Sequence, residues 1–129
     1  MSSPSLITRA RCIGGLRAAV GVAMFVAPRA VARPAPDGTT GTELFLLRTI
    51  GIRDLALGLG TLASTRSTAA GADDDIRRWT RFGLVSDALD VVAGTAAVRW
   101  IGRDGALIAG GLPVPFAALD LWTLRGTSR

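Results

Sequence analysis

The sequence lacks the polar residue types that usually cover the surface of a soluble helical protein. Its 129 residues include no Lys, His, Tyr, Asn or Gln and a single Glu, whereas Arg occurs 15 times. Long amphipathic surface helices are normally built from the missing residues. With 49% hydrophobic residues and a mean hydropathy of +0.39, the composition argues against a freely soluble helical protein and against a disordered chain.

Cysteine and histidine are also scarce, because Cys12 is the one cysteine and histidine is absent. A single cysteine cannot form an internal disulfide, and the chain cannot build a Cys/His metal cluster. We therefore expect no catalytic residue, no metal site and no cofactor, and a protein that is not an enzyme. Cys12 is interpreted as a small apolar packing residue.

Charged residues collect between four apolar stretches of the chain. The stretches carry only 7 of the 25 charged residues and cover 12–28, 44–65, 82–98 and 105–124. A soluble bundle would place charges at every turn of each helix's outer face. Lengths of 17 to 22 residues instead suit a bilayer about 30 Å thick. We predict an all-α, four-helix transmembrane bundle, with buried soluble helices as the alternative because charge-free runs such as 18–28 are short.

The predicted helices and their connections form one integral membrane domain, 1–129. A capping residue, Ser5 or Thr8, begins the first helix, a tight loop contains Gly102 and Asp104, and proline kinks the fourth helix. The acidic triplet at 73–75 precedes the third helix and suits its positive end. The helices cover about 5–28, 43–64, 76–98 and 105–124, and the kinks are expected at Pro113 and Pro115.

The arginines predict the orientation of this bundle. With four retained helices, eight arginines lie on the side of both termini and four on the other, so the positive-inside rule predicts cytoplasmic termini in a bacterial plasma membrane. A cleavable first segment ending near Ala30-Val31-Ala32 is disfavoured because Arg17 interrupts its apolar core. The net charge of +5 follows from this orientation and from anionic headgroups, so no nucleic-acid partner is expected.

Each predicted helix carries a stripe of small or ionisable residues at spacings of three and four. Small residues let helices approach closely in lipid, so the stripes are expected to face one another. The stripes are Gly14-Arg17-Gly21, Gly51-Asp54-Gly58, Gly83-Asp87-Asp90-Gly94 and Gly110-Pro113-Ala117-Asp120.

Six ionisable residues in these helices form the candidate buried polar or ligand site: Arg17, Arg53, Asp54, Asp87, Asp90 and Asp120. Expected depths in the membrane allow Arg17 to pair with Asp120 or Asp87, and Arg53 with Asp90 or Asp87, while Arg48 can extend outward. Arg53 and Asp54 are neighbours about 100° apart around the helix, which predicts that they do not both point along one narrow seam. Two interpretations stay open: the pairs only hold the helices together, or they line a polar pocket or proton path.

Two carboxylate patterns suggest metal chemistry only weakly. Asp87-x-x-Asp90 resembles part of a magnesium motif of phosphatidyl-alcohol transferases, but Val91 stands where that motif has glycine and the later Asp pair is missing. The triplet at 73–75 lacks the spaced third carboxylate of a prenyl-diphosphate site. Neither pattern predicts a metal site.

One motif carries a family resemblance. The segment Arg48-x-x-Gly51-x-Arg53-Asp54-x-x-x-Gly58 resembles an uncharacterised family of small four-helix membrane proteins of high-GC bacteria, and the layout is more distantly similar to DoxX-like proteins. The resemblance implies a fold and a membrane location, with no reaction or substrate. The expected function is a non-enzymatic accessory or interaction subunit, whose partners are the lipid bilayer and another membrane protein or a second copy of the chain. The alternative is a small transport or ligand-binding protein that uses the buried Asp and Arg residues.

Overall fold

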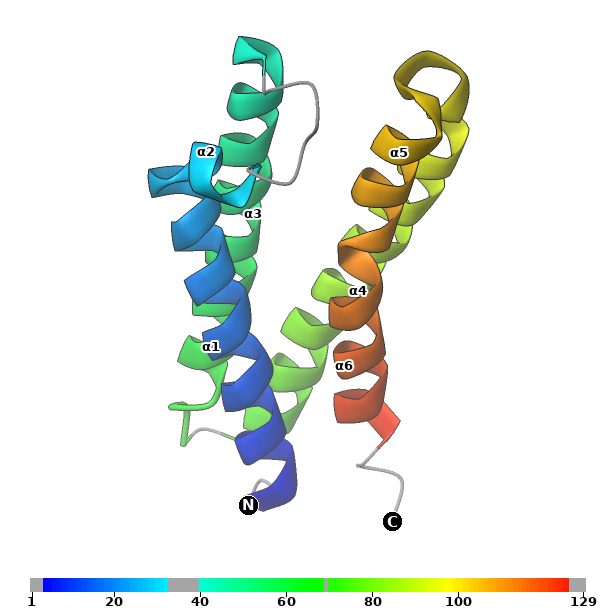
Figure 1. Cartoon of the computed structure of the whole chain (residues 1–129). Coiled ribbons are helices and arrows are strands. Elements are labelled where there is room, and N and C mark those ends of the chain that lie inside the picture. Colours follow the sequence, from blue (N-terminus) through cyan, green and yellow to red (C-terminus); the bar gives the residue numbers. More distant parts are fainter. Residues whose placement is uncertain (1–3, 33–39, 69, 126–129) are drawn as a thin grey trace.

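The computed structural model describes residues 4–32, 40–68 and 70–125, and every regular element in these ranges is a helix. The all-α prediction is therefore confirmed. Figure 1 shows a bundle in which α1 lies along α3 while α4 lies along α5 and α6. α1 begins and α6 ends at the same end of the bundle, next to the α3–α4 connection (Figure 1). The helices are α1 Pro4–Val26, α2 Pro28–Val31, α3 Gly41–Ser64, α4 Ala72–Ala96, α5 Val98–Gly111 and α6 Pro113–Arg125.

The ends of the first three predicted helices need correction. Ser5 and Thr8 lie inside α1, which begins at Pro4, so neither caps it. The predicted loop after the first helix contains the short helix α2. The side chain of Thr40 accepts a hydrogen bond from the backbone N–H of Glu43, and the Glu43 carboxylate accepts one from the backbone N–H of Thr40. The two bonds form a capping box at the start of α3. α4 begins at Ala72, so the acidic triplet lies within its first turn and not before it.

Two breaks interrupt the described chain after α4, and both occur at positions that the sequence indicated. Gly102 has a φ of 73°, a left-handed conformation that favours glycine, and it breaks α5 at the predicted tight loop. The side chain of Asp104 lies outside the described part of the chain. A second break separates α5 from α6 before Pro113, because a proline ring cannot continue the helical hydrogen bonding of the preceding turn. The break predicted at Pro113 is therefore confirmed, whereas Pro115, where a second kink was predicted, lies within the first turn of the continuous helix α6.

Glycines bring α1 and α3 into backbone contact. A Cβ atom placed on Gly51 would lie 2.7 Å from the carbonyl oxygen of Gly21, and one placed on Gly58 would lie 2.6 Å from the carbonyl oxygen of Gly14. A Cβ atom on Gly94 of α4 would likewise lie 2.7 Å from the backbone nitrogen of Gly110 in α5. The small-residue stripes do face one another, as predicted.

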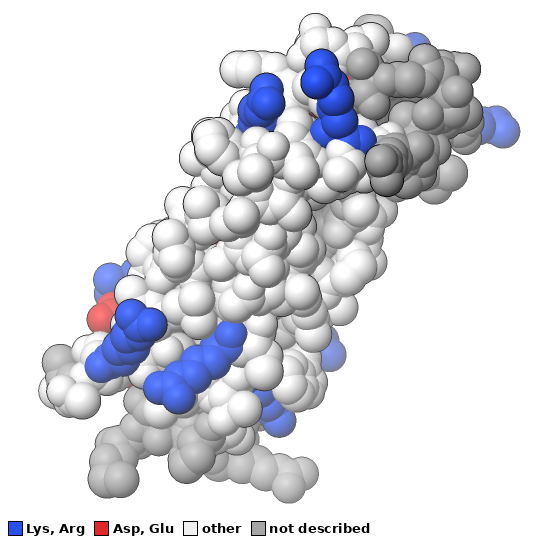
Figure 2. All heavy atoms as spheres, turned by 60° about the vertical axis from the view of Figure 1, so that its left-hand side comes forward, with Lys and Arg blue, Asp and Glu red and all other residues white. Residues whose placement is uncertain are grey.

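Polarity in this bundle is inverted relative to an ordinary soluble protein. Val26 is 71% exposed and Trp100 is 70% exposed, whereas Arg17 is 1% exposed. Much of the interior is polar, and the buried hydrophobic cluster is small: it joins Leu6 and Ala10 of α1 to Ile76 of α4. Figure 2 shows arginines near both ends of one face, with a belt of uncharged side chains between them.

In the described ranges, none of the helices combines the length and the apolar character required of a membrane span.

The glycine contacts predict that Gly58→Ala destabilises the bundle. The added methyl group would meet the backbone nitrogen of Ala18 at 2.6 Å, and backbone atoms cannot move aside without separating the helices. We expect a loss of about 1 to 3 kcal/mol in the free energy of unfolding. Gly15→Ala is the matched control because its new Cβ atom would have no neighbour within 4 Å. Equal melting of the two variants would contradict this packing.

Candidate functional site

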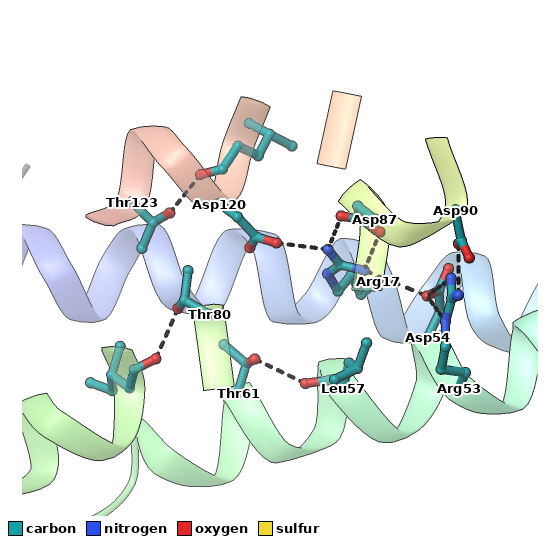
Figure 3. Close-up of polar contacts among 12 residues, drawn as sticks. Arg17, Arg53, Asp54, Leu57, Thr61, Thr80, Asp87, Asp90, Asp120 and Thr123 are labelled. Carbon is teal, nitrogen blue, oxygen red and sulfur yellow. Dashed lines mark hydrogen bonds and ion pairs between the residues drawn. The ribbon is translucent and has the colours of Figure 1, made fainter. Parts of the chain in front are cut away.

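Arg17 lies at the centre of a buried charge cluster, which comprises the six ionisable residues named above. Its Nη2 donates a hydrogen bond to Oδ2 of Asp120 at 2.7 Å and another to Oδ2 of Asp87. Its Nη1 donates to Oδ1 of Asp87 at 3.3 Å and lies 3.5 Å from Oδ1 of Asp54. Figure 3 shows these carboxylates converging on the guanidinium. Since they belong to α3, α4 and α6, Arg17 connects α1 to three other helices.

Space for this guanidinium comes from a missing side chain on α4. A Cβ atom on Gly83 would lie 2.7 Å from Oδ2 of Asp120 and 3.0 Å from Nη2 of Arg17. On its other side, the guanidinium carbon of Arg17 lies 5.0 Å from the ring centroid of Phe116, within the range of a cation–π interaction. Gly83 of the predicted stripe therefore makes room for two charged side chains.

Arg53 forms the second half of the charge cluster. Its Nη1 lies 2.6 Å from Oδ2 of Asp90, and its Nη2 donates to Oδ1 of Asp54 at 3.1 Å. The same Asp54 oxygen faces Arg17, so Asp54 connects the two arginines. This half lies nearer the surface, since the side chains of Arg53 and Asp90 are 31% and 29% exposed.

The structure brings all six predicted residues together. Both pairings proposed for Arg17 occur, and Arg53 pairs with Asp90. Asp54 is buried beside Arg17 while Arg53 is partly exposed and pairs with Asp90, which agrees with the prediction that the two do not both point along one narrow seam. The long arginine side chain nevertheless bends back until its guanidinium meets the neighbouring carboxylate. The Cα–Cβ bonds of the two residues differ in direction by about 100° around the helix, but the arginine side chain is long enough for its guanidinium to cross that angle.

Sequence reasoning also missed the contact between Arg17 and Asp54. The expected depths in the membrane paired Arg17 with Asp120 or Asp87 and did not include Asp54. The glycine stripes held the better signal: Gly14 faces Gly58 and Gly21 faces Gly51 in antiparallel helices, so residues 54 and 55 lie opposite Arg17. The spacing of small residues fixes this register.

Buried threonines are a further polar feature that the sequence analysis did not identify. Each donates its hydroxyl hydrogen to a backbone carbonyl three or four residues earlier in the chain, which satisfies it inside its own helix. Figure 3 shows Thr61 bonded to Leu57, and Thr80 and Thr123 bond the carbonyls of Ile76 and Leu119. These small side chains fill positions where a soluble helical core would hold leucine.

Several other predicted features lie outside the charge cluster. Arg48 is exposed, as expected, and its Nε donates to the carbonyl oxygen of Phe25 at 3.3 Å. The interpretation of Cys12 as a packing residue is wrong, because it faces outward on α1 and is exposed. In the α4 triplet, Asp75 pairs with Arg78 at an exposed position. No group of three or more potential metal ligands occurs in the described part of the chain.

The composition of the charge cluster sets its electrostatics. Four carboxylates and two guanidiniums give a formal charge of −2 when every carboxylate is ionised.

No protein family model, curated protein or solved structure matches this chain. Its own chemistry is that of an internal ion-pair network in which the charges contact mainly one another.

The geometry predicts unequal losses on neutralising the two carboxylates of α4. Asp87 is buried and bonds both terminal nitrogens of Arg17, whereas Asp90 is partly exposed. Asp87→Asn should lower the free energy of unfolding by about 3 kcal/mol because it removes the carboxylate that accepts from both terminal nitrogens of the buried Arg17 guanidinium. Asp90→Asn, the matched control on the same helix, should cost about 1 kcal/mol or less. Denaturant titration measures both, and a larger loss for Asp90→Asn would reverse the assignment of the central pair.

Proposed function

We propose that the protein is a multi-pass integral protein of the bacterial plasma membrane, with four membrane-crossing segments, and acts as a non-enzymatic accessory or interaction subunit. The observation that carries the proposal is the inverted polarity of the bundle. Large apolar side chains such as Leu89 and Val92 face outward, while Arg17 and its carboxylates face inward. A soluble monomer rarely exposes apolar patches beyond a few hundred Å².

Burial of the charged side chains lowers the free-energy cost of inserting this charged sequence into a membrane. A lipid-facing charge at the centre of a span costs about 2.5 to 3.5 kcal/mol. The charged residues of α1 are Arg9, Arg11 and Arg17, and the first two lie near its start. Arg17 is surrounded by carboxylates and by an aromatic ring, so its charge does not meet the apolar exterior. The charge cluster therefore reduces the cost of placing ionisable residues inside a bilayer.

Tryptophan and arginine pairs at both ends of the bundle also support the proposal. The guanidinium carbon of Arg9 lies 4.3 Å from the ring centroid of Trp122, at the end that holds the termini. That of Arg99 lies 4.0 Å from the ring centroid of Trp100, near the opposite end. Indole rings favour the headgroup region and arginines can extend into it. The two pairs would mark the two membrane surfaces.

Saturation of Arg17 by three carboxylates supports a structural role for the charge cluster. With both terminal nitrogens engaged, this guanidinium holds four helices in one arrangement. When the ion pairs hold the protein's own helices together, its apolar outer surface stays free to contact another membrane protein or a second copy of the chain. The resemblance to small four-helix membrane proteins agrees with this location and adds no reaction.

The alternative, a small transport or ligand-binding membrane protein, is supported by the excess of two carboxylates in the charge cluster. In a low-dielectric interior, such an excess favours the uptake of protons or another cation. A carrier of this kind, reconstituted into vesicles, would move protons across the membrane, and Asp120→Asn would abolish that flux. Unchanged flux in Asp120→Asn would remove this alternative and leave the accessory function.

Membrane integration predicts that the protein stays in the membrane fraction after high-salt and carbonate washes. Leu89→Arg tests the lipid contact directly, because the leucine is 63% exposed on α4. An arginine there should reduce the membrane-inserted fraction severalfold, whereas a water-facing site would accept it with little change. Thr68→Arg, at an exposed position in the α3–α4 connection, is the matched control. Release of the folded wild type by carbonate would contradict the proposal.

Orientation gives a separate prediction. With eight arginines on one side of the proposed spans and four on the other, the positive-inside rule predicts that both termini lie in the cytoplasm. A reporter domain that is active only in the cytoplasm should therefore be active when fused to either end, and one that is active only in the periplasm should be inactive. Activity of a periplasm-dependent reporter at either end would show the opposite orientation.

A further inference from the structure

A groove of about 380 Å³ lies at the end of the bundle away from the termini, between the α1–α2 corner and α3. Its apolar wall includes Val26, Pro28 and Leu44, and its charged groups are Arg29 and Arg48. No acidic residue lines it among those described. The groove therefore combines positive charge with an apolar wall.

The hydrogen bond from Arg48 Nε to the carbonyl oxygen of Phe25 positions this arginine. The bond uses one donor and leaves both terminal nitrogens for another acceptor. Within the described part of the chain, neither Arg29 nor Arg48 forms an ion pair with a carboxylate. Two guanidiniums without acidic partners at one groove match the charge of a phosphate group.

A second groove, at the start of α4, gives a useful contrast. It holds Arg77, Arg78 and Arg81 but also Asp74, and Arg78 already pairs with Asp75. The carboxylates there offset much of the positive charge. The groove beside α2 has no such compensation among its lining residues and is the better anion site.

We propose that the groove formed by Arg29 and Arg48 binds the phosphate of a membrane phospholipid. This inference rests on the membrane location proposed above, which places the groove at the level of the headgroups in the outer leaflet. The two guanidiniums contact the phosphate, and the acyl chains follow the apolar surface beside it. Val26 lines the groove and is exposed, and the exposed residues Phe25 and Phe45 are the sequence neighbours of the lining residues Val26 and Leu44. Free inorganic phosphate would match the charge but leave this apolar surface uncovered.

Native mass spectrometry of the detergent-purified protein, titrated with phosphatidylglycerol, tests the proposal. The double variant Arg29→Gln/Arg48→Gln should bind this lipid at least about tenfold more weakly than the wild type, because two charge-assisted contacts are lost. Arg81→Gln/Arg103→Gln, which removes two exposed arginines outside the groove, is the matched control and should bind as the wild type does. Thermal melting of both variants checks that they are folded.

Three results would overturn the inference: equal lipid binding by the wild type and the groove variant, equal losses in both double variants, or inorganic phosphate binding as tightly as the lipid. These failures are distinguishable from failure of the membrane proposal. A wild type that resists carbonate extraction but binds phosphatidylglycerol no better than the groove variant loses only the lipid site. A wild type released by carbonate loses the proposed location as well.

Discussion

Burial of the Arg17 guanidinium among three carboxylates is the interaction on which the bundle depends. An arginine that is 1% exposed must have its charge compensated on the spot, so α3, α4 and α6 each place a carboxylate against it. Gly83 has to lack a side chain because a Cβ atom there would meet both Arg17 and Asp120. The glycine at position 83 therefore follows from the space that these two charged side chains need.

This interior explains the unusual exterior. A core of arginine, aspartate, threonine and glycine buries few large hydrophobic side chains, so residues such as Leu89 and Val92 remain outside. In water, that distribution would give up most of the hydrophobic contribution to folding. In a bilayer, helices associate through close packing and polar contacts, which the backbone contacts of Gly51 and Gly58 and the charge cluster supply. The membrane location proposed above would account for both the polar interior and the apolar exterior.

Local patterns allowed much of the fold and site to be predicted. Spacings of three and four placed the glycines and aspartates on facing stripes, and Pro113 marked a helix break, because both follow from the geometry of one helix. Contacts that depend on two helices were harder. The bond between Arg17 and Asp54 depends on the register of α1 against α3, and the reach of Arg53 to Asp54 depends on side-chain bending. The expected depths in the membrane predict neither of these two contacts.

If the buried charges are stabilised mainly by one another, thermal unfolding in detergent should separate two variants of the charge cluster. Arg17→Met alone leaves Asp87 and Asp120 without a cation and should cost at least about 3 kcal/mol. Adding Asp87→Asn and Asp120→Asn removes those orphaned charges, so the triple variant should recover most of the lost stability. A triple variant that unfolds at least as easily as Arg17→Met alone would contradict the account.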